Sequence, residues 1–216
     1  MMKLYKDSTK AKSFFYYYGW AILVFFGIFF LTFFLIFQAM FHVKRTEKID
    51  IFIAAYGLKN NDVNTQIEKE FKDKGLVEFN IYSYLADDPN TANYFSANGE
   101  KADFVIFSET DIVDMQEYVT YNYMDVSTLV SEVPSLSKYE TYIDNGVARG
   151  IKLFDKTDTS YNETHTFNNW IEFSKEGKEN DSYYLLIDNE SENFDKDNNH
   201  ILGYQVLEYL LNSMVK

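Results

Sequence analysis

Carboxylate side chains dominate the chemistry that this sequence offers. The 216 residues include 33 Asp and Glu against 20 Lys and Arg, a formal net charge of −13 that disfavours binding to a nucleic-acid backbone. Neighbouring acids, such as Asp87-Asp88 or Glu109 with Asp111, are of the type that glycosidases use for acid–base catalysis. At this frequency, however, adjacent acids are expected by chance, and sequence spacing does not give the separation of their carboxyl groups. We therefore predict a protein that is not an enzyme and does not bind nucleic acid.

One acidic segment begins like a calcium-binding loop, with the pattern Asp195-x-Asp197-x-Asn199. An EF-hand loop needs Gly at its sixth position and Glu at its twelfth, and this sequence has His200 and Val206 there. We interpret the segment as a solvated loop that caps a helix. Weak cation binding by its carboxylates is the alternative.

Other catalytic and metal-binding patterns are missing from the sequence. The chain has no Cys, which excludes a disulfide framework, Cys-ligated zinc and a Cys nucleophile. Its three His residues, His42, His165 and His200, are not spaced as metal ligands. The nine Gly residues occur singly, so the sequence has no glycine-rich phosphate loop. We predict no catalytic residue, no metal site and no cofactor.

Aromatic side chains are a further group that can bind a ligand. Tyr combines an apolar face, which stacks on a sugar ring, with a polar hydroxyl group. Seven aromatic residues in the middle of the chain have this potential: Tyr82, Tyr84, Tyr94, Phe95, Tyr118, Tyr121 and Tyr123. Carbohydrate contact and core packing are both open for them. The aromatic content of the whole chain, 19%, favours packing.

Residues 14–41 form an apolar segment that contains ten Phe and no charged side chain. A helix of this length rises about 42 Å, which exceeds the ~30 Å hydrocarbon core of a bilayer. The segment is also about twice as long as the apolar region of a cleaved signal peptide, and no small-x-small pair follows it. We predict an uncleaved transmembrane helix over residues 14–41.

The basic residues around this helix are almost equally divided between its two sides. Four Lys precede it and three Lys and Arg follow it directly, which slightly favours a cytoplasmic segment at residues 1–13. Residues 1–48 carry a net charge of +5, so residues 49–216 carry −18. An acidic domain without Cys is compatible with the outer face of a membrane. We predict a single-pass cell-membrane protein with a juxtamembrane linker at 42–48 and an extracytoplasmic domain at 49–216.

The elements that position the polar side chains follow from apolar runs and the turn residues between them. Short β-rich runs occur at residues 49–55, 76–84 and 102–107, each followed by a helical pattern, and residues 183–187 form a later run. Alternation of strands and helices is typical of a parallel sheet with helices on both faces. We predict the α/β class, with a single three-layer α/β domain and a mostly parallel sheet.

The second half of the domain gives weaker patterns. A hairpin is predicted over residues 141–154, because Asp144-Asn145-Gly146 suits a type I′ turn. Ser108 is expected to cap the helix after the third strand. The polar stretch 155–182 is expected to be held to the core by Trp170, Ile171 and Phe173. A closing helix with one apolar side is predicted over residues 198–214.

The order of these elements resembles the first lobe of bacterial extracellular solute-binding proteins of the ABC-importer type, especially the sugar-binding group. Four segments carry the resemblance: residues 49–56, 79–84, 102–108 and 183–188 with the helix that follows. About 100 of the 168 residues after position 48 are covered by it. This chain departs from the family in two ways, since it has length for one lobe where the family has two, and it lacks the lipidated Cys that anchors Gram-positive members.

The resemblance implies a ligand cleft at the carboxyl ends of the parallel strands, where α/β sheets generally bind ligands. The ligand-binding candidates follow three strand ends: Tyr56 and Gly57, then Tyr84, then Ser108, Glu109 and Thr110.

Two functions are open at this point. In the first, a membrane-anchored, solute-binding-like lobe binds a small polar ligand, such as a sugar, or a partner protein. In the second, the chain is a structural or accessory subunit of a membrane complex. Its lobe is then a docking module for transporter or assembly subunits, and its aromatic-rich helix serves assembly in the membrane.

Overall fold

The computed structural model describes residues 2–41, 43–59, 62–165, 167, 170–178, 180–195 and 197–213. The chain divides into two compact units, Met1–His42 and Val43–Lys216, and each is treated by itself. His42, one of the three histidines, and residue 214, the predicted end of the closing helix, lie outside the described residues.

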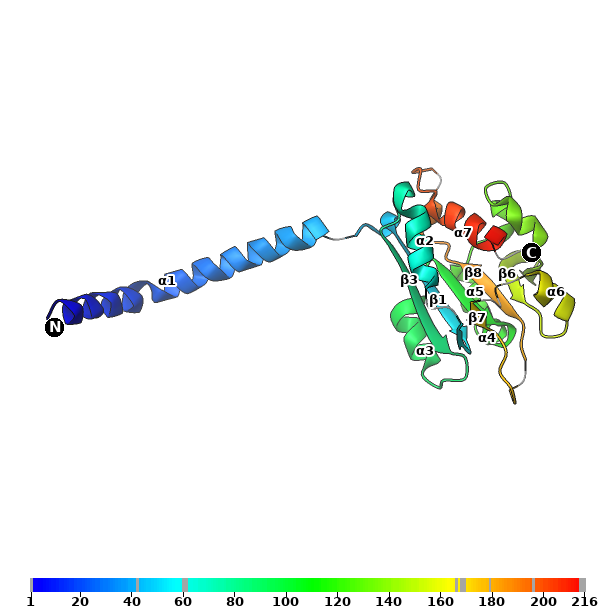
Figure 1. Ribbon diagram of the computed structural model, residues 1–216, viewed down its shortest axis with the longest axis horizontal. Coiled ribbons are helices and arrows are strands. Elements are labelled where there is room, and N and C mark those ends of the chain that lie inside the picture. Colours follow the sequence, from blue (N-terminus) through cyan, green and yellow to red (C-terminus); the bar gives the residue numbers. More distant parts are fainter. Residues whose placement is uncertain are drawn as a thin grey trace. The chain divides into compact units, whose positions relative to one another are not determined.

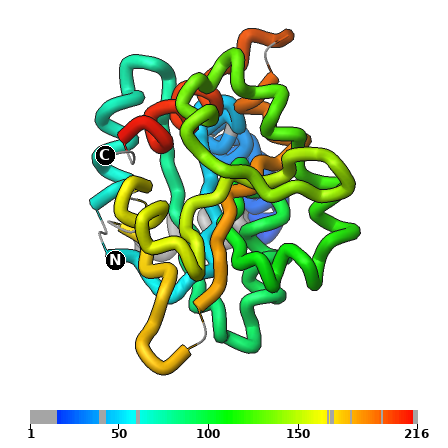
Figure 2. The backbone as a smooth tube through the Cα atoms, turned by 90° about the vertical axis from the view of Figure 1, so that its right-hand side faces the viewer, coloured from blue at the N-terminus to red at the C-terminus, as the bar shows by residue number. Residues whose placement is uncertain are grey.

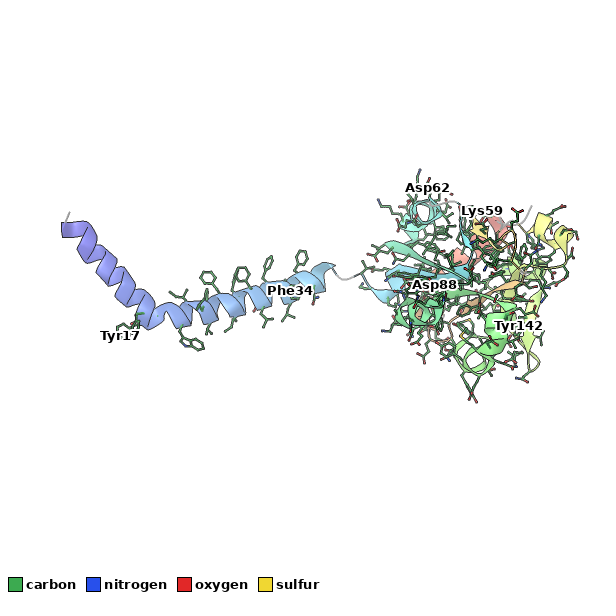
Figure 3. The ribbon with its side chains drawn as sticks, turned by 90° about the horizontal axis from the view of Figure 1, so that it is seen from below. Tyr17, Phe34, Lys59, Asp62, Asp88 and Tyr142 are labelled. Atoms are coloured by element: carbon green, nitrogen blue, oxygen red, sulfur yellow. The ribbon has the colours of Figure 1, made fainter. Side chains whose placement is uncertain are left out.

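Helix α1 (Met2–Phe41) makes up the first unit. Among the described residues it holds one stretch that is long and apolar enough to cross a membrane, Tyr16–Gln38, 23 residues with a mean hydropathy of 2.7. The side chains of Tyr17 and Phe34 project from the helix surface (Figure 3). Inside the stretch, the Thr32 hydroxyl donates to the carbonyl oxygen of Ile28 at 2.9 Å, which satisfies its hydrogen bond within the helix. The helix starts well before the predicted residue 14, because the preceding Lys and Ala residues favour helix.

The second unit is built on a mixed sheet of six strands within the described residues, in the order β3-β1-β4-β8-β6-β5 (Figure 1). These strands are β1 (Lys48–Ala55), β3 (Glu78–Leu85), β4 (Phe104–Ser108), β5 (Thr141–Asp144), β6 (Val147–Phe154) and β8 (Tyr183–Ile187). Strands β3, β1 and β4 pair in parallel, whereas β8 is antiparallel to both β4 and β6. Four of the six strands therefore run in one direction. A small second sheet pairs β2 (Gly57–Leu58) with β7 (Ile171–Glu172).

Helices cover both faces of the central sheet, which gives the predicted three-layer α/β fold. They are α2 (Val63–Phe71), α3 (Thr91–Tyr94), α4 (Glu109–Asp114), α5 (Gln116–Asn122), α6 (Thr159–Thr164) and α7 (Leu202–Ser213). Helices α2 and α7 pack on one face, where the rings of Phe71 and Tyr209 meet edge to face at 5.4 Å. The π-turn η3 (Phe95–Gly99) and helices α4 and α5 pack on the other face.

Short 3-10 turns complete the second unit: η1 (Arg45–Glu47), η2 (Lys72–Lys74), η4 (Val126–Leu129), η5 (Pro134–Lys138) and η7 (Glu192–Phe194). Turn η5 lies beside the C-terminal helix α7, and Figure 2 shows the light-green and red segments side by side. Hydrogen bonds join this segment to α7, among them one from the Ser135 hydroxyl to Glu208 at 2.7 Å and one from the hydroxyl of Tyr139, the residue after η5, to the Leu211 carbonyl oxygen at 2.8 Å. The long connection between α5 and β5 is therefore held against the core.

Several local predictions are confirmed. Strand β8 has the predicted bounds, and the hairpin of β5 and β6 turns at Asn145 and Gly146, whose φ angles of 50° and 84° suit a type I′ turn. Ser108 caps α4 by accepting a hydrogen bond from the backbone N–H of Asp111. Trp170 and Phe173 are fully buried and hold the polar stretch 155–182 to the core.

The predicted linker over residues 42–48 is wrong for most of its length. The second compact unit begins at Val43, Arg45–Glu47 form the turn η1, and Lys48 starts β1. The Arg45 guanidinium lies 2.8 Å from the carboxylate of Asp50 and 3.2 Å from that of Asp103. The charge of Arg45 thus compensates the buried carboxylate of Asp103.

Candidate functional site

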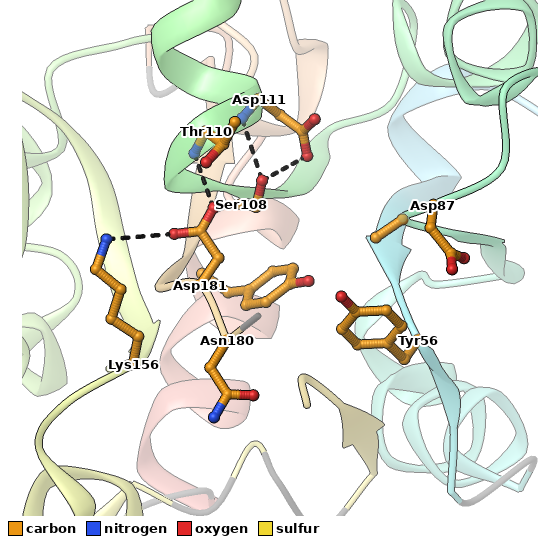
Figure 4. A pocket seen from close by; sticks show the side chains of 10 residues that line it. Tyr56, Asp87, Ser108, Thr110, Asp111, Lys156, Asn180 and Asp181 are labelled. Atoms are coloured by element: carbon orange, nitrogen blue, oxygen red, sulfur yellow. Dashed lines mark hydrogen bonds and ion pairs between the residues drawn. The ribbon is translucent and has the colours of Figure 1, made fainter. Parts of the chain in front are cut away.

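A polar cavity of about 330 Å³ opens at the carboxyl edge of the parallel strands. Ten of the described residues line it: Tyr56, Ala86, Asp87, Ser108, Thr110, Asp111, Lys156, Asn180, Asp181 and Tyr183. Figure 4 shows Tyr56 and Asp87 on one side of the cavity and Thr110, Lys156 and Asp181 on the other.

Sheet topology explains why these side chains meet. Strands β1, β3, β4 and β6 run in the same direction, so the residues that follow them gather at one edge of the sheet. Strand β8 runs the opposite way, so its beginning lies at that same edge. The cavity is therefore closed by Asp181 and Tyr183 as well as by the residues that follow the parallel strands.

The start of helix α4 forms one wall of the cavity. The Ser108 hydroxyl donates to the Asp111 carboxylate at 2.7 Å and accepts from the Asp111 backbone N–H at 3.1 Å. Burial is the largest influence on Asp111 and raises the pKa of its carboxyl, against the lowering effect of the Ser108 hydrogen bonds. Among the described residues, Asp111 has no cationic partner within salt-bridge distance.

Asp181 bridges this wall to the segment before β8. Its carboxylate accepts from the backbone N–H groups of Thr110 at 3.0 Å and Ser182 at 2.8 Å, and the Lys156 ammonium lies 3.6 Å away. Burial raises the pKa of Asp181, but the hydrogen bonds from Thr110 and Ser182 and the charge of Lys156 outweigh it. The net pKa of Asp181 is lowered, and the carboxylate is ionised at neutral pH.

Two further ion pairs stand at the rim of the cavity. The Lys156 ammonium lies 2.9 Å from the Glu109 carboxylate, and this hydrogen bond raises the pKa of Lys156. The Asp87 carboxylate lies 2.8 Å from the Lys178 ammonium, which lowers the pKa of Asp87. The charges of Lys156 and Lys178 are therefore compensated by carboxylates of the protein itself.

The hydroxyl groups of Tyr56 and Tyr183 also line the cavity. Neither hydroxyl has a hydrogen-bond partner among the described residues. Tyr183 is only 1% exposed, and its ring packs on those of Phe173 and Phe154. Burial raises the pKa of Tyr183, with further contributions from Tyr56, Asp111 and Asp181, so the phenol is neutral at physiological pH. Tyr56 is held by its backbone N–H, which donates to the Glu172 carbonyl oxygen at 2.9 Å.

Of the six residues expected at the cleft, the structure places Tyr56, Ser108 and Thr110 in the cavity lining. Glu109 lies at the rim, where it pairs with Lys156. Gly57 is next to the cavity but belongs to β2, in register with Glu172 of β7. Its role is in backbone pairing, and it does not line the cavity.

Tyr84 does not belong to the cavity. It lies in β3 opposite Ala54, and its ring stacks on those of Tyr94 at 4.3 Å and Phe52 at 5.4 Å. Side chains alternate between the two faces of a strand, and this register directs Tyr84 to the face covered by η3, α4 and α5. Its hydroxyl accepts a hydrogen bond from Asn98 at 2.9 Å.

The other candidate aromatic residues also favour packing over ligand contact. Phe95 and Tyr123 are buried in the same cluster, and Tyr82, Tyr94 and Tyr118 pack against it. Tyr121 is 70% exposed and lies outside the cavity lining.

Six polar or aromatic residues of the cavity lining were not among the ligand-binding candidates predicted from the sequence: Asp87, Asp111, Lys156, Asn180, Asp181 and Tyr183. Asp87 and Lys156 follow the ends of β3 and β6 by two residues, which is a usable signal. Asn180 and Asp181 precede a strand, so only the antiparallel direction of β8 places them here.

The described lining residues supply hydrogen-bond acceptors and charged groups. They do not form a catalytic arrangement of a nucleophile, a base and an orienting group. Within the described part of the chain, no group of three His, Asp or Glu side chains is arranged to hold a metal ion. The imidazole ring of His165 contacts the rings of Tyr139 and Tyr161 and does not line the cavity. Ser108 is engaged as the cap of α4. The arrangement suits holding a polar molecule by hydrogen bonds and charge.

Comparison with known proteins gives one partial match. No protein-family model and no curated protein matches the chain. Among solved structures, the chain is similar to the N-glycan transport solute-binding protein NgtS from Streptococcus pneumoniae, with 18% sequence identity and a TM-score of 0.37. The match covers 50% of this chain and 25% of that protein, so this chain spans about a quarter of the NgtS length.

Proposed function

We propose that the chain is a non-enzymatic, membrane-anchored binding protein that holds a small polar ligand in the cavity at the strand ends. In this proposal α1 crosses the membrane once, through Tyr16–Gln38, with the segment before it in the cytoplasm. Residues 43–216 form the extracytoplasmic binding domain. A structural or accessory role in a membrane complex is the alternative.

The observation that carries the proposal is the pair of hydroxyl groups on Tyr56 and Tyr183. Tyr183 is almost completely buried as a residue, but its hydroxyl oxygen is not among the fully buried unpaired atoms and is accessible from the polar cavity that the side chain lines. The hydroxyl has no partner among the described residues, so it is free to bond to a bound molecule. A ligand hydroxyl or amino group in the cavity supplies the missing hydrogen bond.

The cavity volume limits the size of the ligand. Small-molecule sites are typically clefts of roughly 300–1,000 Å³, and this one has about 330 Å³. A molecule of the size of a monosaccharide or an amino acid fits such a space. The carboxylates of Asp87, Asp111 and Asp181 are hydrogen-bond acceptors, so the ligand should carry several donors.

A binding function also agrees with how the reactive groups are used. The Ser108 hydroxyl is hydrogen-bonded to Asp111, and the Lys156 ammonium is paired with Glu109 and Asp181. Nucleophilic catalysis needs a nucleophile with a neighbouring base that a third group orients. Among the described lining residues, the phenols of Tyr56 and Tyr183 and the amide of Asn180 have no side-chain partner in the protein, and all three suit hydrogen bonding to a bound molecule.

The test is isothermal titration calorimetry on the full chain in lipid nanodiscs. The probes are D-glucose, D-glucosamine, 1,4-butanediol and putrescine. We expect at least one probe to bind, and Tyr183→Phe to weaken it roughly three- to tenfold, the value of one neutral hydrogen bond. Tyr121→Phe is the matched control, because Tyr121 is exposed and outside the lining.

Protein stability separates a binding role of Tyr183 from a structural one. Its hydroxyl bonds to nothing described in the protein, so Tyr183→Phe should change the free energy of unfolding by less than about 0.5 kcal/mol. If no probe binds, or if Tyr183→Phe leaves the affinity unchanged, the proposed site is wrong. The accessory-subunit alternative would then be favoured.

A further inference from the structure

We propose that the ligand of this cavity is a small organic cation, whose ammonium group binds beside Asp111 and the tyrosine hydroxyls. This inference rests on the proposed function, since it concerns the same cavity. It adds the chemical class of the ligand, a primary amine or diamine, as opposed to a neutral polyol.

Charge is the first argument. The described residues in the cavity and at its rim include four carboxylates and two ammonium groups. The carboxylates are those of Asp87, Glu109, Asp111 and Asp181, and the ammonium groups are those of Lys156 and Lys178. The Lys178 ammonium is paired with Asp87, and that of Lys156 is shared between Glu109 and Asp181. The site therefore has an excess of two negative charges. A bound neutral molecule would displace water from these carboxylates without compensating their charge.

Asp111 locates the excess charge within the cavity. Its partner is the Ser108 hydroxyl at 2.7 Å, and no described Lys or Arg lies within salt-bridge distance of it. The carboxylate is half-buried at the start of α4 and lines the cavity. An ammonium group of a ligand is the counter-charge that this carboxylate lacks, and such charge-assisted hydrogen bonds are about twice as strong as neutral ones.

The tyrosines give an independent argument for a ligand at this place. Tyr183 is 1% exposed, lines the cavity and has no hydrogen-bond partner among the described residues. A phenol oxygen accepts a hydrogen bond, and an ammonium group has up to three protons to donate. One ammonium group can therefore satisfy both an Asp111 oxygen and a tyrosine hydroxyl. The aromatic ring of the half-buried Tyr56 adds a surface that favours cations.

The test compares ligand pairs that differ in charge and little in shape, on the full chain in nanodiscs. Putrescine is paired with 1,4-butanediol, and D-glucosamine with D-glucose. We expect the amine of at least one pair to bind at least tenfold more tightly than its neutral partner, with an affinity that falls as salt is added.

A matched pair of variants assigns the effect to Asp111. Asp111→Asn removes the charge and keeps an oxygen that accepts from the Ser108 hydroxyl, so the cap of α4 is preserved. It should weaken amine binding roughly 10- to 100-fold, as expected for a hydrogen bond to a charged group. Asp114→Asn makes the same change on an exposed position of the same helix, outside the lining, and should leave the affinity within twofold.

The outcomes separate this inference from the proposed function. If a neutral probe binds as tightly as its amine, or if Asp111→Asn and Asp114→Asn behave alike, the cation class is overturned and the binding function stands. If none of the four probes binds, both are overturned.

Discussion

Replacing Arg45 by Met should destabilise the domain of residues 43–216 strongly, although Arg45 is only a few residues from the apolar helix. The Arg45 guanidinium lies 2.8 Å from Asp50 and 3.2 Å from Asp103, and Asp103 is 0% exposed. Removing one partner of a fully buried ion pair costs about 3–5 kcal/mol. The Arg45 side chain is 29% exposed, so we expect a smaller loss in the free energy of unfolding, about 2–3 kcal/mol.

Other contacts keep the loss within this range. Asp103 retains hydrogen bonds from the Ser191 hydroxyl, the Asn193 amide and the backbone N–H of Asp50 after Arg45 is removed. For a domain of this size, each kcal/mol shifts Tm by about 2–4 °C, so a fall of roughly 5–10 °C is expected.

The loss in the free energy of unfolding caused by Arg45→Met should be larger at neutral pH than at acidic pH. Burial raises the pKa of Asp103 above its ordinary 3.8, and the Arg45 charge opposes this shift. Between the unfolded and the folded pKa, the folded state holds a proton that the unfolded state has released, so stability falls as pH rises. Without Arg45 the folded pKa is higher and this interval is wider. The destabilisation by Arg45→Met should therefore be largest at neutral pH and shrink as pH falls toward the ordinary carboxyl pKa.

The assay is urea unfolding of residues 43–216, followed by circular dichroism, at neutral pH and at mildly acidic pH. Lys44→Met is the control, because its side chain is 75% exposed and pairs with Glu47 on the surface. It removes the same charge and should cost less than about 0.5 kcal/mol. A loss for Arg45→Met that equals the control, or that stays constant with pH, would refute the reasoning about the buried carboxylate.

Two further predictions concern the start of the domain and Tyr84, which lies outside the cavity. A fragment of residues 49–216 should unfold at a lower urea concentration than residues 43–216, because it lacks both Arg45 and Lys48 beside Asp50; equal midpoints would contradict this account of the boundary. Tyr84→Ala should lower the free energy of unfolding by about 2 kcal/mol through the lost stacking on Tyr94 and Phe52, while probe affinity in calorimetry stays within twofold. A large loss of affinity in a variant of unchanged stability would return Tyr84 to the binding site.

Much of the fold could be predicted from the residues, because apolar runs and turn residues are local. The run of residues 183–187 and the turn Asn145-Gly146 specify their elements without help from distant parts of the chain. The direction of a strand is not local. Periodicity indicates that residues 183–187 form a strand, but pairing with β4 and β6 decides that it is antiparallel.

The contrast between local sequence patterns and non-local strand direction explains which residues of the cavity lining could be predicted and which could not. Residues after parallel strands, such as Tyr56, Ser108 and Thr110, were predictable from the rule for α/β sheets. Asp181 and Tyr183 were missed because they lie at the start of a strand, which reaches the cavity only through its reversed direction. Tyr84 was misplaced because its face depends on strand register, which a single apolar run does not define.

The most direct test of the central claim, that the cavity at the strand ends binds a small polar molecule, is an NMR titration of ¹⁵N-labelled residues 43–216. Putrescine is added up to millimolar concentration. We expect saturable shifts that cluster on the amides of Tyr56, Thr110 and Asp181, with the Thr110 amide affected through its hydrogen bond to Asp181. Saturable shifts elsewhere in the domain, or no saturable shift with putrescine or the other three probes, would contradict the account.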